Sequence, residues 1–277
     1  GQHERAIANF RKYVSDYPNK DDVPQITWRI GLILDRKGDH EAVIDHFAEY
    51  ARKYGGRDPA RELCAEFKAV EAQLELGRKD TARQGYEGLI ESYKKLPEEA
   101  KGKACPLNAV ALASFKLIEP EYENYMSIDL SGGEKQMTQK LVKKLEMVKE
   151  LQGQYTEVLG IGQGDYGIAS LYRIGYMYQH LAEAIFNTEC PSRLTDDQCM
   201  IYQAALQEKA FPLEEKAIEA YDNALAKAYE LGLYNEWLAK TQEALKTYEP
   251  QRFPDVHEYE LIASEETLEI PGLMEME

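Results

Sequence analysis

Two glycine-rich segments of the chain have the composition of phosphate-binding loops. The first, at residues 129–136, reads DLSGGEKQ, and the second, at residues 160–167, reads GIGQGDYG and contains a G-x-G-x-x-G pattern. Glycines let the backbone N–H groups at the start of a helix approach a phosphate closely, so both segments suggest nucleotide chemistry. Such a motif functions only within a particular arrangement of strand, helix and partner residues, which the rest of the sequence must supply.

Neither segment has the setting that nucleotide chemistry requires. The first reads like the signature of ABC-type ATPases, but the P-loop pattern G-x-x-x-x-G-K-[ST] occurs nowhere in the sequence. Ser131 and Glu134 instead precede an amphipathic run, so we expect a capping box and a long helix over residues 134–159. The second segment follows this helix rather than a strand, which predicts an interhelical loop with Asp165 as the next N-cap. We therefore expect no nucleotide and no cofactor to bind.

Residues 40–46, HEAVIDH, contain two histidines and a glutamate that invite comparison with a zinc site. A zinc metalloprotease places two histidines four residues apart on one face of a helix. His40 and His46 are six residues apart, about 240° around a helix, so we expect both to be solvated, with His40 at a helix start. Adjacent carboxylates such as Glu98 and Glu99 point apart and cannot act as an acid-base pair. The sequence predicts neither a metal site nor an enzyme.

The pairing of the four cysteines would indicate in which cellular compartment the protein works. None forms a C-x-x-C pair, which argues against zinc knuckles and thioredoxin-like chemistry. Cys190 and Cys199 flank a proline-containing loop, with Thr195 as the expected N-cap of the next helix. We predict a disulfide between them, worth about 2 to 3 kcal/mol, the alternative being two ordinary cysteines near a turn. Cys64 and Cys105 either pair or remain buried thiols, and stable disulfides would imply an oxidising compartment.

Charge and hydropathy narrow the range of partners. The 277 residues include 49 acidic and 33 basic side chains, a net charge of −16 that would repel nucleic acid and anionic membranes. No apolar run reaches the roughly 18 to 20 residues needed to span a bilayer. Because the chain begins at Gly1 inside an amphipathic pattern, we expect it to be part of a longer protein.

The apolar residues recur at helical spacing along nearly the whole chain, which predicts an all-α protein with more than half of its residues in helices. A ladder with steps of four, three and four residues occurs four times. Its first three copies begin 37 and 39 residues apart, and a fixed period of this size favours stacked helical hairpins over a simple bundle. The four ladders are Ala6-Phe10-Tyr13-Tyr17, Val43-Phe47-Tyr50-Tyr54, Ala82-Tyr86-Leu89-Tyr93 and Ala217-Tyr221-Ala224-Ala228.

These patterns resemble the tetratricopeptide repeat (TPR). The segment ERAIANFRKYVSDYP at residues 4–18 matches its second helix, whereas LYRIGYMY at residues 171–178 and the region of Gly31 match its first. The resemblance implies that Gly31 and Gly175 lie where two helices cross and leave no room for a larger side chain. The ladder copy that begins at Ala82 has Val70 at the crossing position and is degenerate in this respect. Gly38 and Gly77 are expected at turns between paired helices.

The resemblance implies a superhelical solenoid of TPR-like hairpins with an inserted long helix. We expect N-terminal repeats over residues 1–100, the first of them truncated, with complete hairpins at 24–56 and 61–96. Further helical repeats are expected over residues 101–250 and an acidic, proline-containing tail over 251–277. The sequence leaves open whether that tail packs as an extended segment or is disordered.

Residues 130–255 also resemble the C-terminal half of cell-envelope TPR proteins of myxobacteria and related bacteria. This likeness implies the periplasm or cell envelope of a Gram-negative bacterium, where some such proteins serve motility or transport assemblies. The long helix departs from an ordinary TPR pattern, which puts a single uninterrupted groove in doubt.

The resulting functional hypothesis is a non-enzymatic scaffold that binds a peptide or partner protein on its concave surface. The alternative is a purely structural subunit that uses its convex face or its ends. In TPR-like hairpins the first helix lines the concave side, although each aromatic residue there, taken alone, belongs more often to the core. The resemblance thus assigns partner binding to Trp28, Leu32, Asp35, Arg36, Tyr172, Tyr176, Gln179 and His180.

Overall fold

The computed structural model describes residues 1–254, which are 82% helical and contain no strand, so the expected all-α fold is confirmed. A single 3-10 turn, Gly55–Arg57, joins α3 to α4. The helices are α1 (Gln2–Asp16), α2 (Val23–Lys37), α3 (His40–Tyr54), α4 (Pro59–Glu75), α5 (Lys79–Lys94), α6 (Glu98–Lys101), α7 (Ala104–Ser127), α8 (Glu134–Gly160), α9 (Gly164–Phe186), α10 (Asp196–Leu231) and α11 (Glu236–Tyr248).

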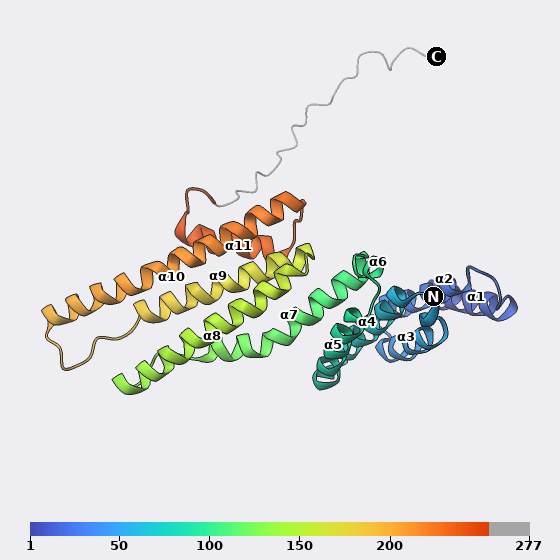
Figure 1. Cartoon of the computed structure of the whole chain (residues 1–277), viewed down its shortest axis with the longest axis horizontal. Helices are drawn as coiled ribbons and strands as arrows, with labels where there is room; N and C mark the ends of the chain where they lie inside the picture. The colour runs from blue at the N-terminus through green and yellow to red at the C-terminus, as the bar shows by residue number, and fades with distance from the viewer. Residues whose placement is uncertain (255–277) are drawn as a thin grey trace, which may run out of the picture.

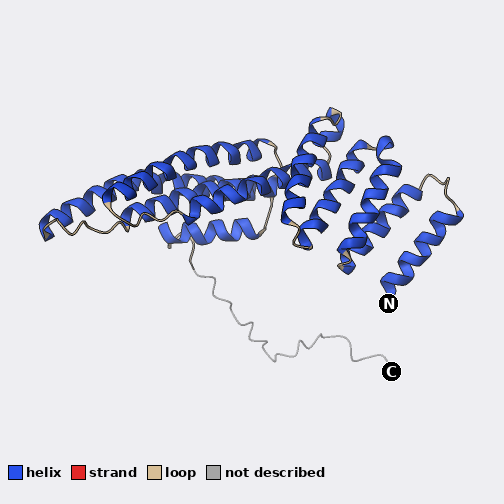
Figure 2. Ribbon diagram, turned by 90° about the horizontal axis from the view of Figure 1, so that it is seen from below, coloured by secondary structure: helices blue, strands red, loops and turns tan. Residues whose placement is uncertain are grey.

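The first five helices are short and stack in a row (Figure 2). Gly38 and Gly77, with φ angles of 74° and 73°, form the turns that close the hairpins α2/α3 and α4/α5. Only glycine adopts this left-handed conformation without strain. Asp39 and Asp58 then cap α3 and α4 by accepting backbone N–H groups. Both hairpins agree with the expected spans.

The aromatic ladders form the core of these hairpins. In α3 the residues Val43, Phe47, Tyr50 and Tyr54 are all buried, and the ladders of α5 and α10 are mostly buried as well. The ladder of α1 is covered less completely, because Tyr17 is 50% exposed. A ladder residue is therefore protected only where a neighbouring helix lies against it.

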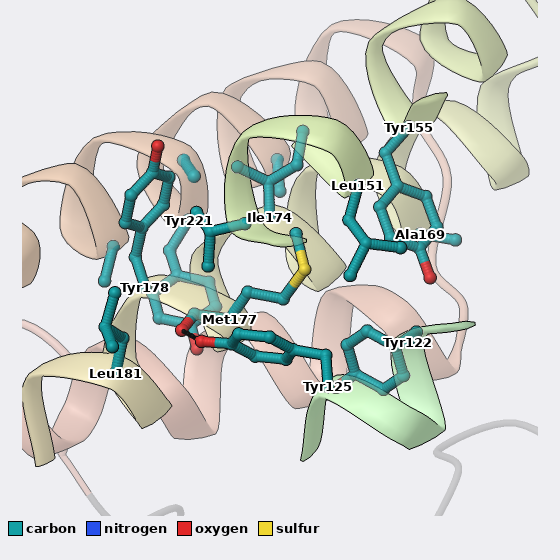
Figure 3. Packing of buried hydrophobic residues seen from close by; sticks show 14 of the residues in the cluster. Tyr122, Tyr125, Leu151, Tyr155, Ala169, Ile174, Met177, Tyr178, Leu181 and Tyr221 are labelled. Carbon is teal, nitrogen blue, oxygen red and sulfur yellow. Dashed lines mark hydrogen bonds between the residues drawn. The ribbon is translucent and has the colours of Figure 1, made fainter. Parts of the chain in front are cut away.

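The second part of the chain is a layered bundle of long helices, in which α8, α9 and α10 run side by side (Figure 1). Its core is one large cluster that includes Tyr125, Leu151, Tyr155, Met177 and Tyr221 (Figure 3). The expected long helix is confirmed as α8, but α7 and α10 are also long. Helix α7 connects the two parts, because it packs on α4 and α5 as well as on α8 and α9.

Two disulfides reinforce this arrangement. Cys64 of α4 is bonded to Cys105 of α7, with 6.1 Å between the Cα atoms. Cys190 is bonded to Cys199 across the loop that leads into α10, with a Cα separation of 5.8 Å. Thr195 caps α10 as expected, in a capping box with Gln198.

The predicted capping box at the start of α8 is wrong. The N-cap is Gly133, and no side chain caps it. The Ser131 hydroxyl donates instead to the carboxylate of Asp129, which also binds Lys140 Nζ at 2.6 Å. These hydrogen bonds, first that of Lys140, hold the pKa of Asp129 below its usual range. Because Asp129 engages the hydroxyl, Ser131 stays in the loop, where the two following glycines also lie.

The prediction that Asp165 caps the helix after the second glycine-rich segment is wrong. Gln163 caps α9 by accepting the Tyr166 N–H at 2.8 Å, while Asp165 accepts a hydrogen bond from Asn235 at 2.7 Å. Gly162 forms the interhelical turn with a φ of 83°. A Cβ at Gly164 would lie 2.5 Å from Leu233, so this glycine permits close packing rather than phosphate binding.

The predicted solvation of His46 is also wrong. Its Nε2 lies 2.8 Å from the Thr27 carbonyl oxygen, and burial lowers its pKa. His40 begins α3 as expected. Among residues 1–254, no cluster of three metal-ligating side chains is present.

Within the same residues, no helix combines the length and the apolar character of a membrane span. Most of the predicted acidic tail, residues 255–277, lies outside the described residues.

Candidate partner-binding surface

Gly31 fixes the crossing of α2 and α3. A Cβ built at this position would lie 2.5 Å from the ring of Phe47 and 2.8 Å from His46. Since an aromatic ring cannot yield without displacing its neighbours, the two helices approach this closely only with glycine here. The expected role of this small residue is confirmed.

The aromatic and aliphatic candidates beside Gly31 contribute to packing between hairpins. Trp28 meets Phe47 and Tyr50 edge to face, with ring centroids 4.9 and 5.2 Å apart. The guanidinium of Arg61 lies 5.3 Å from the Trp28 ring, and Leu32 packs against the same cluster. Trp28 is therefore half-buried, and only part of its ring remains for a partner.

The charged candidates of α2 face the neighbouring hairpin and the solvent. The Asp35 carboxylate lies 3.3 Å from Lys68 Nζ of α4, which also binds Glu71 at 2.9 Å. Arg36, one residue further on, is exposed. The Asp35–Lys68–Glu71 group links the first helices of adjoining hairpins on one side of the row.

Gly175 repeats the crossing geometry in the bundle. A Cβ at this position would lie 2.6 Å from the ring of Tyr221 on α10. Tyr172 and Tyr176 flank it, with nearly parallel rings whose centroids are 5.8 Å apart. Tyr172 also contacts Trp237 of α11 at 5.7 Å. These three aromatic residues are half-buried, so each retains an accessible edge.

Arg173 provides a charged centre among these rings. Its guanidinium lies 4.2 Å from the ring centroid of Tyr122 and 5.3 Å from that of Trp237. It donates two hydrogen bonds to the Glu119 carboxylate, at 3.1 and 2.6 Å. Tyr155 donates a third to the same carboxylate. Burial raises the pKa of Tyr122 to about 12, so its phenol is neutral. We call Tyr172, Arg173, Tyr176 and Trp237 the aromatic surface.

Gln179 points into the bundle, whereas His180 is half-buried and lines a hollow at the end of the bundle. Gln179 is only 9% exposed; its amide accepts from the Tyr221 hydroxyl at 2.7 Å and donates to Glu183 at 2.9 Å. His180 Nδ1 lies 3.1 Å from Lys144 Nζ. The second set of candidates is therefore divided: Tyr172 and Tyr176 belong to the aromatic surface, Gln179 to the interior and His180 to the hollow at the end of the bundle.

Lys144 is a buried lysine that holds the end of α7. Its Nζ donates to the carbonyl oxygens of Tyr125 at 2.8 Å and Ile128 at 3.0 Å, and its side chain has no exposed surface. Carbonyls at a helix C-terminus lack intrahelical partners and carry partial negative charge, which favours a cation there. Burial lowers the pKa of Lys144 to about 8, and burial followed by the nearby Lys144 charge lowers that of His180.

A hollow of about 770 Å³ opens at the end of the bundle beside this lysine. One wall is the α7–α8 loop with the first glycine-rich segment, and the other is the disulfide-bonded α9–α10 loop. Arg193 and Glu134 join the two walls through an ion pair of 2.8 Å. The glycines thus line an opening between two helical hairpins, next to His180.

Comparison with known proteins identifies one repeat in this geometry. Residues 65–95, which lie in α4 and α5, match the family model of the tetratricopeptide repeat. Residues 65–95 are thus similar to a single TPR. No curated protein matches the sequence.

Solved structures show two distant similarities. A TPR repeats protein from Bacteroides fragilis is 13% identical with a TM-score of 0.43, over 88% of this chain and 91% of that one. BtubC from P. vanneervenii is 15% identical with a TM-score of 0.36, over 84% of this chain and 91% of that one.

The matched TPR is the copy that lacks a glycine in its first helix. Val70 occupies the crossing position, and a Cβ at Gly85 of the second helix would lie in contact with its side chain. The small residue is therefore present on the opposite helix of the hairpin. The close approach is preserved because only one of two facing positions must be small.

Sequence reasoning missed Arg173, Glu119 and Trp237. Arg173 stands between Tyr172 and Tyr176, a position that a search for the groove-facing residues of TPR first helices passes over. Glu119 and Trp237 lie 54 and 64 positions away in the chain, and no local pattern connects them to Arg173. Only the packing of α7, α9 and α11 brings these residues together.

Proposed function

We propose that the protein is a non-enzymatic scaffold that binds a peptide or a partner protein on the side lined by α2, α4 and α9. The TPR at residues 65–95 supports an interaction role. The observation that carries the binding surface is the partly accessible cluster of Tyr172, Tyr176 and Trp237 around Arg173. Tyrosine, tryptophan and arginine are the residues that dominate binding energy at protein interfaces.

The exposed Arg36 and the Asp35–Lys68–Glu71 group would supply polar contacts further along the same partner. Trp28 would add an aromatic edge on the same helix as Arg36. Leu32 is part of the same packing, and we assign Gln179 and His180 the supporting role of fixing α9.

A pull-down with matched variants tests this assignment. Tyr172→Ala combined with Tyr176→Ala should abolish recovery of the partner that the unmodified protein captures. A control variant with Glu87→Ala and Glu91→Ala, both exposed on the second helix α5, should retain it. The captured protein is then purified and its affinity measured directly. Equal affinity for the tyrosine variant and the control would refute the proposed surface.

The alternative, a structural subunit that assembles through its ends, is favoured by a separate observation. Phe186, Met200, Ile201 and Phe211 are each more than half exposed near one end of the bundle. The two roles are compatible, because this end is separate from the aromatic surface.

The cell envelope of a Gram-negative bacterium is the proposed location. Two disulfides support an oxidising compartment such as the periplasm, because cytosolic reductants would keep the four thiols free. The resemblance of residues 130–255 to envelope TPR proteins of myxobacteria supports the same proposal. We propose no nucleic acid or nucleotide partner, a view supported by the net charge of −16 and by the packing roles of the glycines.

A further inference from the structure

The first half of α10 has a free face. Between Asp196 and Lys209 no side chain is fully buried, and the first buried residue of the helix is Ala210. Tyr202 and Leu206 make partial contacts on one face, while the opposite face is open. This stretch lies at the end of the bundle far from the short helices (Figure 1).

The free face carries large apolar side chains. Met200 is 62% exposed, Ile201 72% and Phe211 58%, and Phe186 at the end of α9 is 55% exposed. A hollow of about 720 Å³ lies between the end of α9 and this part of α10, lined by Phe186, Met200, Gln203, Ala204 and Gln207. Contiguous exposed apolar surface of this kind marks an interaction site, whereas single exposed residues do not.

Three of the apolar residues of α10, Met200, Ala204 and Phe211, form one straight stripe with the polar Gln207, whereas Ile201 lies about 100° around the helix from Met200. Met200, Ala204, Gln207 and Phe211 follow each other at steps of four, three and four residues, so they lie on one side of the helix. At a rise of 1.5 Å per residue the stripe is about 16 Å long, or three helical turns. A partner helix presents its own side chains at the same spacing, which makes a helix the natural occupant.

Acidic residues border this stripe on both sides. At about 100° per residue, Asp196 and Glu214 fall on one side of it, and Asp197, Glu208 and Glu215 fall on the other. Within residues 1–254 these five carboxylates have no ion-pair partner.

The basic residues of this part of α10 lie elsewhere. Lys209 falls on the opposite side of the helix from the stripe, and the ammonium of Lys216 lies 5.1 Å from the Tyr178 ring. The charged residues of α10 that border the stripe are therefore all acidic.

We propose that the stripe of α10, together with Phe186, binds an amphipathic helix of a partner protein whose apolar face is bordered on both sides by lysine or arginine. Charge complementarity selects this occupant over a second copy of the chain, whose net charge of −16 repels it. The Cys190–Cys199 disulfide fixes the loop that forms one wall of the hollow. This surface is separate from the aromatic surface and does not depend on it.

Fluorescence anisotropy with a labelled 18-residue peptide tests the proposal. The probe places leucines at helical spacing of three and four residues, bordered by lysines, and its matched control replaces every lysine with glutamate. We expect the lysine peptide to bind and the glutamate peptide to bind at least tenfold more weakly. Absence of lysine-peptide binding at millimolar concentration would overturn the proposal.

Matched variants locate the binding. Met200→Gln with Phe211→Gln should weaken the lysine peptide about tenfold or more, because exposed aromatic and apolar anchors are removed. Asp197→Lys with Glu208→Lys should weaken it similarly, whereas Glu87→Lys with Glu91→Lys on α5 makes the same change in net charge and should have little effect. Equal loss in both charge variants would show non-specific attraction and reject the site.

Two further measurements complete the test. The residues substituted on α10 and α5 are exposed, and circular dichroism checks that each variant keeps its helices. Light scattering measures the mass of the unmodified protein; a dimer that Phe211→Gln dissociates would assign the stripe to a second copy and overturn the proposed occupant. Tyr172→Ala should leave peptide binding unchanged, so failure of this proposal and failure of the aromatic surface are distinguishable.

Discussion

The short-helix repeats and the long-helix bundle bury their side chains by different means. In α1 to α5, helices of 15 to 17 residues pack through aromatic ladders, and no polar or charged residue of these five helices is buried. In α7 to α11, one larger core coexists with buried polar groups such as Lys144, Gln179 and Thr241. A repeat buries its apolar face against its two neighbours alone. In the bundle, long helices end inside a shared interior, so the polar backbone groups at those ends need hydrogen-bond partners there.

This difference shows which residues determine how the helices pack in each region. A ladder and a facing glycine fix the crossing of two helices locally, whatever lies further along the chain. In the bundle, Lys144 must meet the carbonyls that end α7, and Arg173 must meet Glu119, so hydrogen bonds select one register among several apolar alternatives. Each region contains one of the two tryptophans, Trp28 and Trp237, so the unfolding of each region can be followed by the fluorescence of its own tryptophan.

The largest expected effect concerns the covalent link between the regions. Replacing Cys64 and Cys105 by serine opens a loop of 41 residues and should lower the free energy of unfolding by about 4 kcal/mol. Urea unfolding followed by Trp28 and Trp237 fluorescence, each in a variant lacking the other tryptophan, should then show separate transitions. Coincident and unshifted transitions would mean that α7 alone couples the regions.

Lys144→Met tests the polar interior of the bundle. The substitution removes the ammonium donor from both carbonyls; that of Tyr125 keeps only the Ile128 N–H at 3.3 Å, and the change should cost about 2 kcal/mol. Lys143→Met, one residue away and exposed, should cost almost nothing. Trp237 fluorescence during urea unfolding measures both variants. If methionine is tolerated equally at both positions, apolar packing alone is sufficient for the bundle.

The second disulfide affects only one end of the bundle. Replacing Cys190 and Cys199 by serine opens a loop of about ten residues and should lower the stability by about 2 to 3 kcal/mol, with the Trp28 transition unchanged. Mass spectrometry of a non-reducing digest checks the bond itself. Free thiols at both positions in protein from its native compartment would contradict the disulfide and the proposed location.

The two glycines at helix crossings, Gly31 and Gly175, should contribute equally to the stability of their regions. Gly31→Ala and Gly175→Ala each force a Cβ against an aromatic ring and should cost about 2 kcal/mol. The first should shift the Trp28 transition and the second the Trp237 transition. Gly88→Ala and Gly153→Ala, where a Cβ has open space, should instead stabilise their regions by a few tenths of a kcal/mol or more. Equal effects at all four positions would show that helix propensity dominates.

The smallest effect is a pH dependence confined to the bundle. Burial lowers the pKa of Lys144 to about 8 from its ordinary 10.5, so the unfolded chain binds more protons between these values. Stability should therefore increase by about 1 kcal/mol from pH 8 to pH 9, below the range in which the buried tyrosines matter. Lys144→Met should remove this increase. A decrease over the same range would exclude the lowered pKa.

Much of the repeat region could be predicted from the sequence. The ladders, Gly38 and Gly77 lie at fixed local spacings, and they identified the hairpins α2/α3 and α4/α5. The crossing roles of Gly31 and Gly175 followed from the resemblance to the TPR, and the disulfide of Cys190 and Cys199 from a short loop. Helix caps were less predictable: Ser131 and Asp165 had suitable types and spacing, but other side chains competed for them.

The sequence by itself determined the all-α class, the helical period and the absence of a P-loop, because these depend on residues within a few turns of one another. Only the tertiary structure decided which helix faces remain accessible. It placed Gln179 inside the bundle and His180 beside the hollow at its end, assembled the aromatic surface from α9 and α11, and left the stripe of α10 uncovered. These outcomes depend on contacts between segments 36 to 65 residues apart, whose geometry the local pattern of neither segment contains.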